Sequence, residues 1–70
     1  MMSFTSSEQE ELYKLGFNED YMEFVYPHDD FSCYKSYEHL YHVLYDGEDI
    51  EVTNFEDLVV KVKNIIGEIK

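Results

Sequence analysis

The sequence predicts an α+β domain: an N-terminal helix, an antiparallel sheet of three to four strands, and a C-terminal amphipathic helix packed on one sheet face. Three observations predict this order, namely a Ser-x-x-Glu capping sequence, an Asp-Gly pair between alternating segments, and a terminal stripe of apolar residues. The chain has 70 residues, and so short a chain buries only about 60 % of its unfolded surface. We therefore expect one domain over residues 1–70, with residues 1–6 flexible.

The first helix is bracketed by a start signal and a stop signal. Ser7 and Glu10 have the spacing of a capping box, in which a hydroxyl and a carboxylate each bind a free backbone amide. Gly16 favours the left-handed conformation that ends many helices, and the resulting Schellman motif would bring Phe17 back onto the last turn. The sequence thus predicts a helix over residues 8–15.

Residues 21–26 fit two patterns. Their apolar side chains alternate as in a strand, yet three of them also have helical spacing. We favour a strand, because the residue before Pro27 is restricted to extended geometry and because aromatic and β-branched residues dominate the segment. Residues 28–30, His-Asp-Asp, predict a turn.

Further strands are predicted in the middle of the chain. Residues 31–37 alternate, and residues 40–45 have apolar groups on both faces, which suits a central strand. Asp46-Gly47 is the strongest hairpin signal, because glycine adopts a positive φ at little steric cost. Residues 49–52 form the return strand, with their isoleucine and valine inward and their two acids outward.

Residues 55–69 show the clearest pattern, since apolar residues recur at steps of three and four. Two caps are available at the start, Thr53 with Glu56 or Asn54 with Asp57, and both place acids at the positive end of the helix dipole. The predicted core consists of Leu12, Leu15, Phe17, Phe24, Val43, Ile50, Val52, Phe55, Leu58, Val59, Val62, Ile65 and Ile66.

The chain is strongly acidic. It has 16 acids, 5 lysines and no arginine, which gives a formal net charge of -11. Fifteen of the acids and two of the lysines lie in residues 1–58, so the acidity belongs to the first helix, the turns and the hairpin. Such a charge disfavours direct binding to nucleic acids and to anionic membranes, and the lack of arginine disfavours phosphoryl-transfer enzymes. A cationic partner fits better.

No motif predicts catalysis, a metal site or a cofactor. Cys33 is the only cysteine and predicts a small buried side chain in a reducing cytoplasm. His39 and His42 are three residues apart, which on a strand places the imidazoles on opposite faces. Residues 46–49 lack the alternating ligands of a calcium loop. Residues 1–7 have neither a basic nor an apolar segment, so we expect no signal peptide and a cytoplasmic protein that is not an enzyme.

Carboxylates and tyrosines form the candidate binding site. Outward side chains on a strand recur about every 6.6 Å, so acids of the hairpin can form a row comparable to nucleic-acid phosphates. Tyrosine offers rigid contact area, and carboxylates steer a positive partner towards it. The alternative is that the acids only increase solubility and the tyrosines pack at the core edge. The predicted partner-binding residues are Asp46, Glu48, Asp49, Glu51, Tyr34, Tyr37 and Tyr41, with Tyr21 as a further candidate.

In size, acidity and helix–sheet–helix layout, the chain is similar to small accessory proteins of bacteriophages and mobile elements, many of which inhibit a host nuclease, polymerase or repair enzyme. The resemblance covers the layout alone and assigns no residue. It implies an inhibitor directed at a host protein, without identifying the target. Together with the charge of -11 and the aromatic residues, it leads us to expect a binding protein that occupies a basic surface of a host nucleic-acid-processing protein, with a decoy for DNA as one version of this hypothesis. The alternative is a small self-associating domain, in which tyrosines and apolar helix surface bury against a second copy.

Overall fold

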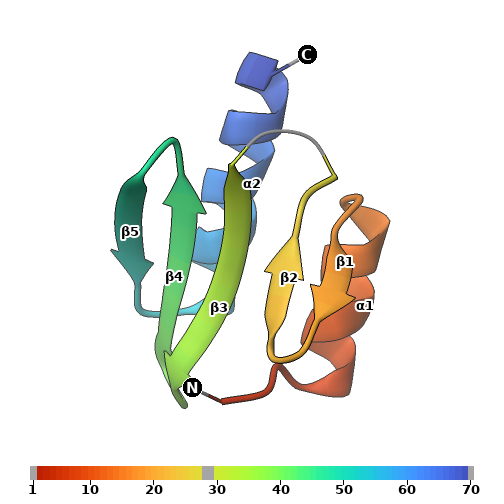
Figure 1. The fold of residues 1–70 in the computed structure, drawn as a ribbon. Helices are drawn as coiled ribbons and strands as arrows, with labels where there is room; N and C mark the ends of the chain where they lie inside the picture. Colours follow the sequence, from red (N-terminus) through yellow and green to blue (C-terminus); the bar gives the residue numbers. More distant parts are fainter. Residues whose placement is uncertain (1, 28–29, 70) are drawn as a thin grey trace.

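A computed structural model describes residues 2–27 and 30–69 of the chain (Figure 1). Its five strands form one antiparallel sheet in which strands adjacent in sequence pair, in the order β1-β2-β3-β4-β5. This confirms the predicted α+β class, with one strand more than the upper estimate. The elements are α1 (Ser6–Lys14), β1 (Asn18–Asp20), β2 (Glu23–Val25), β3 (Phe31–Tyr37), β4 (Leu40–Tyr45), β5 (Glu48–Val52) and α2 (Phe55–Ile69).

The start of α1 differs from the prediction, because the capping box consists of Thr5 and Glu8 rather than Ser7 and Glu10. The Glu8 amide donates a hydrogen bond of 3.3 Å to the Thr5 hydroxyl, and the Thr5 amide donates one of 2.8 Å to the Glu8 carboxylate. Both pairs have the sequence spacing of the motif. The helix therefore begins two residues earlier than predicted.

The predicted end of α1 is confirmed. Gly16 has a φ of 103°, which a residue with a side chain rarely adopts. The Gly16 amide donates to the Tyr13 carbonyl, and the Phe17 amide donates to the Leu12 carbonyl. These are the two hydrogen bonds of a Schellman motif, and they place Phe17 and Leu12 together in the core.

β1 is the strand that the sequence did not predict. Its residues, Asn-Glu-Asp, are all exposed and have low strand propensity. It forms because it pairs with β2 across a two-residue turn, Tyr21 and Met22, and because the Tyr13 hydroxyl donates to the Glu19 carboxylate at 3.3 Å. The strand predicted over residues 21–26 is correspondingly shorter, since its first two residues form this turn.

The central strands match the prediction closely. β3 and β4 have the predicted bounds, and β5 begins one residue earlier, at Glu48. β4 pairs with strands on both sides, as its apolar residues on both faces indicate. Asp46 and Gly47 have φ values of 52° and 81°, as a type I′ turn requires. The register between β3 and β4 shifts around Ser36, which creates a β-bulge.

Both helices lie on the same face of the sheet, behind it in Figure 1. At the start of α2 the Asp57 amide donates a hydrogen bond of 2.8 Å to Asn54 Oδ1, so Asn54 with Asp57 is the cap used. Neither helix of the described chain is long and apolar enough to cross a membrane. Residues 28 and 29 of the predicted turn lie outside the described residues.

The core lies between the sheet and the two helices. Seven of the predicted core residues are buried, and the other six pack half-buried against them. Residues 2–5, which were expected to be flexible, instead pack on the sheet: the Met2 amide donates to the Lys35 carbonyl at 2.8 Å, and Phe4 is buried. Among the described residues, the buried hydrophobic residues outside the predicted core are Phe4, Tyr26, Phe31, Cys33 and Tyr41, and of these only Cys33 was predicted to be buried.

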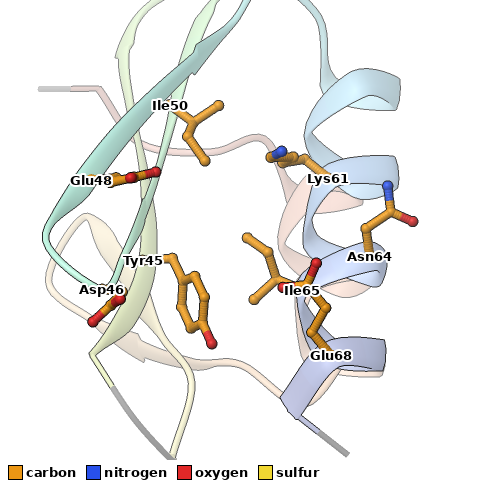
Figure 2. A pocket seen from close by; sticks show the side chains of 8 residues that line it. All are labelled: Tyr45, Asp46, Glu48, Ile50, Lys61, Asn64, Ile65 and Glu68. Carbon is orange, nitrogen blue, oxygen red and sulfur yellow. The ribbon is translucent and has the colours of Figure 1, made fainter.

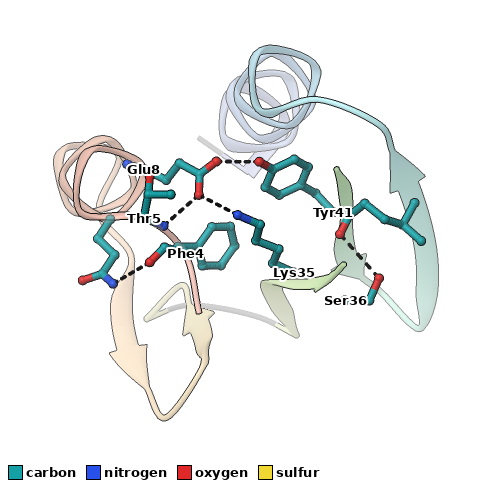
Figure 3. Close-up of polar contacts among 8 residues, drawn as sticks. Phe4, Thr5, Glu8, Lys35, Ser36 and Tyr41 are labelled. Atoms are coloured by element: carbon teal, nitrogen blue, oxygen red, sulfur yellow. Dashed lines mark hydrogen bonds and ion pairs between the residues drawn. The ribbon is translucent and has the colours of Figure 1, made fainter. Parts of the chain in front are cut away.

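A charged cluster is buried between the helices (Figure 3). Glu8 extends from α1 to the ammonium of Lys35 at 3.3 Å and accepts a hydrogen bond from the Tyr41 hydroxyl. The Lys35 ammonium also lies 5.4 Å from the centre of the Tyr41 ring. Because every polar atom of this cluster has a partner, the charges are tolerated in the core.

Candidate binding surface

Because both helices cover one face of the sheet, the other face is uncovered. Residues opposite each other in a sheet project to the same side, and the register places Asn18, Val25, Ser32, Leu44 and Asp49 in one row across all five strands. Alternation along each strand gives the remaining members. The open face comprises Asn18, Asp20, Glu23, Val25, Ser32, Tyr34, Ser36, Leu40, His42, Leu44, Asp49 and Glu51.

His42 lies at the centre of the open face and is fixed by three neighbours. The Tyr34 ring stacks on its imidazole, with ring centres 4.4 Å apart and ring planes 2° apart. Nε2 lies 2.8 Å from the Ser36 hydroxyl, and Nδ1 lies 3.0 Å from Asp49 Oδ1. The side chain is buried, so these contacts determine its orientation.

Ser36, His42 and Asp49 have the hydrogen-bond connectivity of a Ser-His-Asp triad. A nucleophilic serine also needs donors that stabilise the oxyanion formed on its substrate. The Ser36 hydroxyl instead lies 3.4 Å from the Leu40 carbonyl oxygen, which is an acceptor and cannot stabilise an oxyanion. We therefore interpret the three residues as a network that orients His42 and Asp49.

Two pairs of carboxylates flank this centre. Asp20 and Glu23 are cross-strand neighbours on β1 and β2, and Asp49 and Glu51 alternate along β5. Burial raises the pKa of the Tyr34 hydroxyl, and the charge and hydrogen bonding of Asp49 and the charges of Glu51 and Glu23 raise it further. Carboxylates near both edges of the open face, on β2 and on β5, thus raise the pKa of the same tyrosine.

The described lysines lie elsewhere in the molecule. Lys35 is buried on the helix side of β3, Lys14 belongs to α1, and Lys61 and Lys63 belong to α2. Within residues 2–27 and 30–69, the open face therefore has four acids and no lysine. The described lysines thus lie in the helices or on the helix side of the sheet, whereas acids occur both on the open face and in the helices.

The structure divides the predicted row of acids between two sides of the β4–β5 hairpin. Asp49 and Glu51 belong to the open face, whereas Asp46 and Glu48 line a cleft of about 220 Å³ between the hairpin and α2 (Figure 2). Lys61 lines the same cleft. The cleft is smaller than a typical ligand pocket of about 300–1,000 Å³, and its acids do not extend the row on the open face.

The predicted tyrosines also separate. Tyr34 lies on the open face, and Tyr37, at the end of β3, is 70 % exposed. The prediction for Tyr41 is wrong, because this residue is 4 % exposed and faces the helices, where its hydroxyl donates to Glu8. Tyr21, the further candidate, is 94 % exposed in the β1–β2 turn.

The histidines do not come together. His39 is exposed in the β3–β4 turn, while His42 is held in the open face. Among the residues that the structure describes, no three His, Cys, Asp or Glu side chains are placed to hold a metal ion. His28 lies outside the described residues.

Two acids of the open face, Asp20 and Glu23, were missed by the sequence reasoning. Their role depends on the pairing of β1 with β2, which the composition of β1 does not indicate. Glu23 alternates with the buried Phe24, so this acid could have been found once the strand was assigned to residues 23–25.

The chain matches no protein-family model, and comparisons with curated proteins and with solved structures find no match.

Proposed function

We propose that this protein is a cytoplasmic, non-enzymatic binding protein of the phage or mobile-element type, which inhibits a basic nucleic-acid-processing protein of the host. It occupies the nucleic-acid-binding surface of that partner as a DNA mimic. The observation that supports this proposal is the open face, where four carboxylates flank Tyr34 and no lysine of the described chain projects. The partner supplies the lysines and arginines that complement these carboxylates.

The spacing of the carboxylates supports a DNA mimic. Glu51 pairs with His42, and His42 pairs with Tyr34, so these residues form one row that continues towards Glu23 on β2. Three strand spacings separate β2 from β5, or roughly 14 Å. The major groove of B-DNA is about 12 Å wide, so the strands that carry the two flanking pairs of carboxylates are separated by a distance of the same order as the width of this groove.

The total charge supports fast association with a basic partner. At -11, the protein attracts a positive surface over a Debye length of about 8 Å at physiological ionic strength. Such steering raises association rates by one to three orders of magnitude, and salt weakens it. Binding should therefore decrease steeply as the salt concentration rises.

Part of the acidity has a structural explanation. β1 and β5 are the edges of the sheet, and charged side chains on edge strands prevent pairing with strands of other molecules. This explanation covers Asp20 on β1 and Asp49 and Glu51 on β5. It does not cover Glu23, because β2 is an interior strand, and a binding role accounts for all four acids.

The experiment is an affinity purification from bacterial lysate with the tagged protein, at low and high salt and with competitor duplex DNA, followed by mass spectrometry. Two variants of equal net charge are compared with the wild type. Asp49→Asn/Glu51→Gln neutralises part of the open face, and Glu10→Gln/Glu56→Gln removes two exposed charges from the helices. Asparagine at position 49 can still accept the hydrogen bond from His42.

We expect the wild type to retain a basic nucleic-acid-binding protein at low salt and to lose it to DNA or high salt. The open-face variant should retain several-fold less, and the helix variant should resemble the wild type. If both variants retained equally less of the basic protein, the effect would depend on net charge and not on the open face. Retention that neither salt nor DNA changes would contradict DNA mimicry.

Self-association is the competing hypothesis. A twofold dimer through the open face would bring the carboxylates of both copies to one interface, and like charges there are unfavourable. We therefore expect the purified protein to sediment as a monomer at low salt. A dimer that persists across a dilution series would favour the competing hypothesis.

A further inference from the structure

Exposed apolar side chains gather at one end of the sheet. Six large hydrophobic residues are exposed within residues 2–27 and 30–69, and four of them lie in or beside the turns there: Met2, Tyr21, Met22 and Tyr37. We call these four residues the tip. Their proximity follows from the register, since Phe24 pairs with Cys33, so that the turn before β2 is level with residues 35–36 at the end of β3. Met2 forms a bridge to Lys35 at the same level.

The backbone of Tyr21 is in a conformation that disfavours a bulky residue. Its φ is 59°, and it is the first residue of a two-residue hairpin turn. Hairpins with a positive φ at this position prefer glycine, and a large side chain with positive φ is an outlier in proteins. The ring is 94 % exposed, so the fold gains almost nothing from burying it. A strained and exposed aromatic residue is more readily explained by binding than by stability.

Carboxylates surround the tip. Asp20 and Glu23 flank the β1–β2 turn directly, and Glu38 follows Tyr37 in the β3–β4 turn. Asp20 and Glu23 also belong to the open face, so the tip is continuous with it. An apolar group within a ring of negative charge complements an apolar recess within a ring of positive charge.

We infer that the tip anchors the protein to its partner: Tyr21 and Tyr37 enter an apolar recess, rimmed by lysine and arginine, on a nucleic-acid-binding protein. This inference rests on the proposed function and adds its anchor residues. The carboxylates of the open face provide attraction and orientation. The tip provides the buried aromatic contact that dominates most protein interfaces.

The inference predicts a trade-off between stability and binding at Tyr21. Tyr21→Gly relieves the backbone strain and removes an exposed ring, so the midpoint of thermal unfolding should rise by about 4 °C. The same variant should retain at least about tenfold less of the basic protein that the wild type retains, as should Tyr37→Ser. The matched control is Val60→Ser, which removes an exposed apolar side chain (59 % exposed) from the opposite, helical side.

The test uses the affinity purification described above, with quantitative mass spectrometry of the DNA-displaceable basic protein and thermal melts of every variant. The inference is supported if only the tip variants retain less of the basic protein and if Tyr21→Gly has a higher melting temperature than the wild type. Full retention by the tip variants overturns it and leaves the proposed function intact. If Val60→Ser retains equally less of the basic protein, the partner contacts the apolar recess of about 360 Å³ between the helices, which Val60 lines. This result also overturns the inference.

Two further results count against the inference. If the wild type retains no DNA-displaceable basic protein, the proposed function fails and the anchor fails with it. If sedimentation shows that the purified wild type self-associates and the tip variants do not, the tip binds a second copy of the chain, which overturns the inference for a different reason.

Discussion

The hydroxyl of Tyr41 in β4 donates a hydrogen bond of 2.5 Å to Oε2 of Glu8 in α1, across 33 positions of sequence. The other carboxylate oxygen accepts from the Thr5 amide and lies 3.3 Å from the Lys35 ammonium. One side chain thus caps the helix and attaches it to two strands. Because an unpaired charge at a buried site costs several kcal/mol, the position of α1 depends on this carboxylate.

Glu8→Gln should lower the free energy of unfolding by about 2–3 kcal/mol at pH 7, because Lys35 then stays buried without a counter-charge. Burial raises the pKa of Glu8, but hydrogen bonds from Tyr41, the Thr5 amide and Lys35, with the charge of Lys35, bring it below 4.5. The ionised form therefore stabilises the fold above pH 4.5, and this contribution is lost as the pH falls through the lowered pKa. Urea titrations from pH 7 to pH 3 should show the difference from wild type shrinking below pH 4.5.

The control for this prediction is the double variant Glu8→Gln/Lys35→Met. It removes both charges, so it should be more stable than Glu8→Gln at pH 7. The difference in stability between these two variants should stay the same in acid, because neither contains the Glu8 carboxylate. A difference between wild type and Glu8→Gln that is the same at pH 7 and pH 3 would mean that ionisation of Glu8 does not contribute to stability.

The fold was predictable where a pattern within a few residues indicates the same structure as the burial of the side chains. The apolar stripe of α2, the glycine that ends α1 and the Asp46-Gly47 turn each have a signal within a few residues, and all three predictions were right. β1 lacks such a signal, because three exposed polar residues become a strand only by pairing with β2. The capping box was placed two residues late because Thr5 and Ser7 have equivalent sequence patterns, and only the contacts of Glu8 with Lys35 and Tyr41 distinguish them.

The candidate site was predictable only in part. Alternation identifies residues that share a face, and it correctly grouped Asp49 with Glu51. It does not identify the face that the helices cover, which is why Tyr41 was assigned to the surface. The contact of Ser36 with His42 follows a β-bulge, and the bulge has no signal in this sequence.

Cys33 should be unreactive in the folded protein. Its side chain is 0 % exposed, and burial, with a smaller effect of the Glu23 charge, raises its pKa to about 12. The thiolate is the reactive form, so a disulfide reagent at pH 8 should modify the native protein only as fast as it opens. The same reagent should react at once in concentrated urea. A native rate equal to that of a free thiol would show that β3 is not covered as described.

Leu58→Ala should cost about 3 kcal/mol of unfolding free energy, a large share of the stability of so small a domain. Leu58 is fully buried between α2 and the sheet. Val60→Ala on the same helix provides the control, because Val60 is exposed and the substitution slightly improves helix propensity. Chemical denaturation of the two variants should separate them clearly. If Leu58→Ala were neutral, the apolar stripe of α2 would be facing another direction.

Two glycines allow a test of backbone conformation without a change in packing. A methyl group added at Gly47 or at Gly67 would meet nothing within 4 Å. Gly47 has a φ of 81° in the β4–β5 turn, so Gly47→Ala should destabilise the protein by about 1 kcal/mol through backbone strain. Gly67 lies in α2, so Gly67→Ala should stabilise it by about 0.5 kcal/mol by restricting the unfolded chain. Melting temperatures that move in opposite directions confirm both assignments. If both substitutions lowered the stability, Gly67 would not be helical in solution. If Gly47→Ala did not lower the stability, the turn would not fix the register that places Asp49 and Glu51 on the open face.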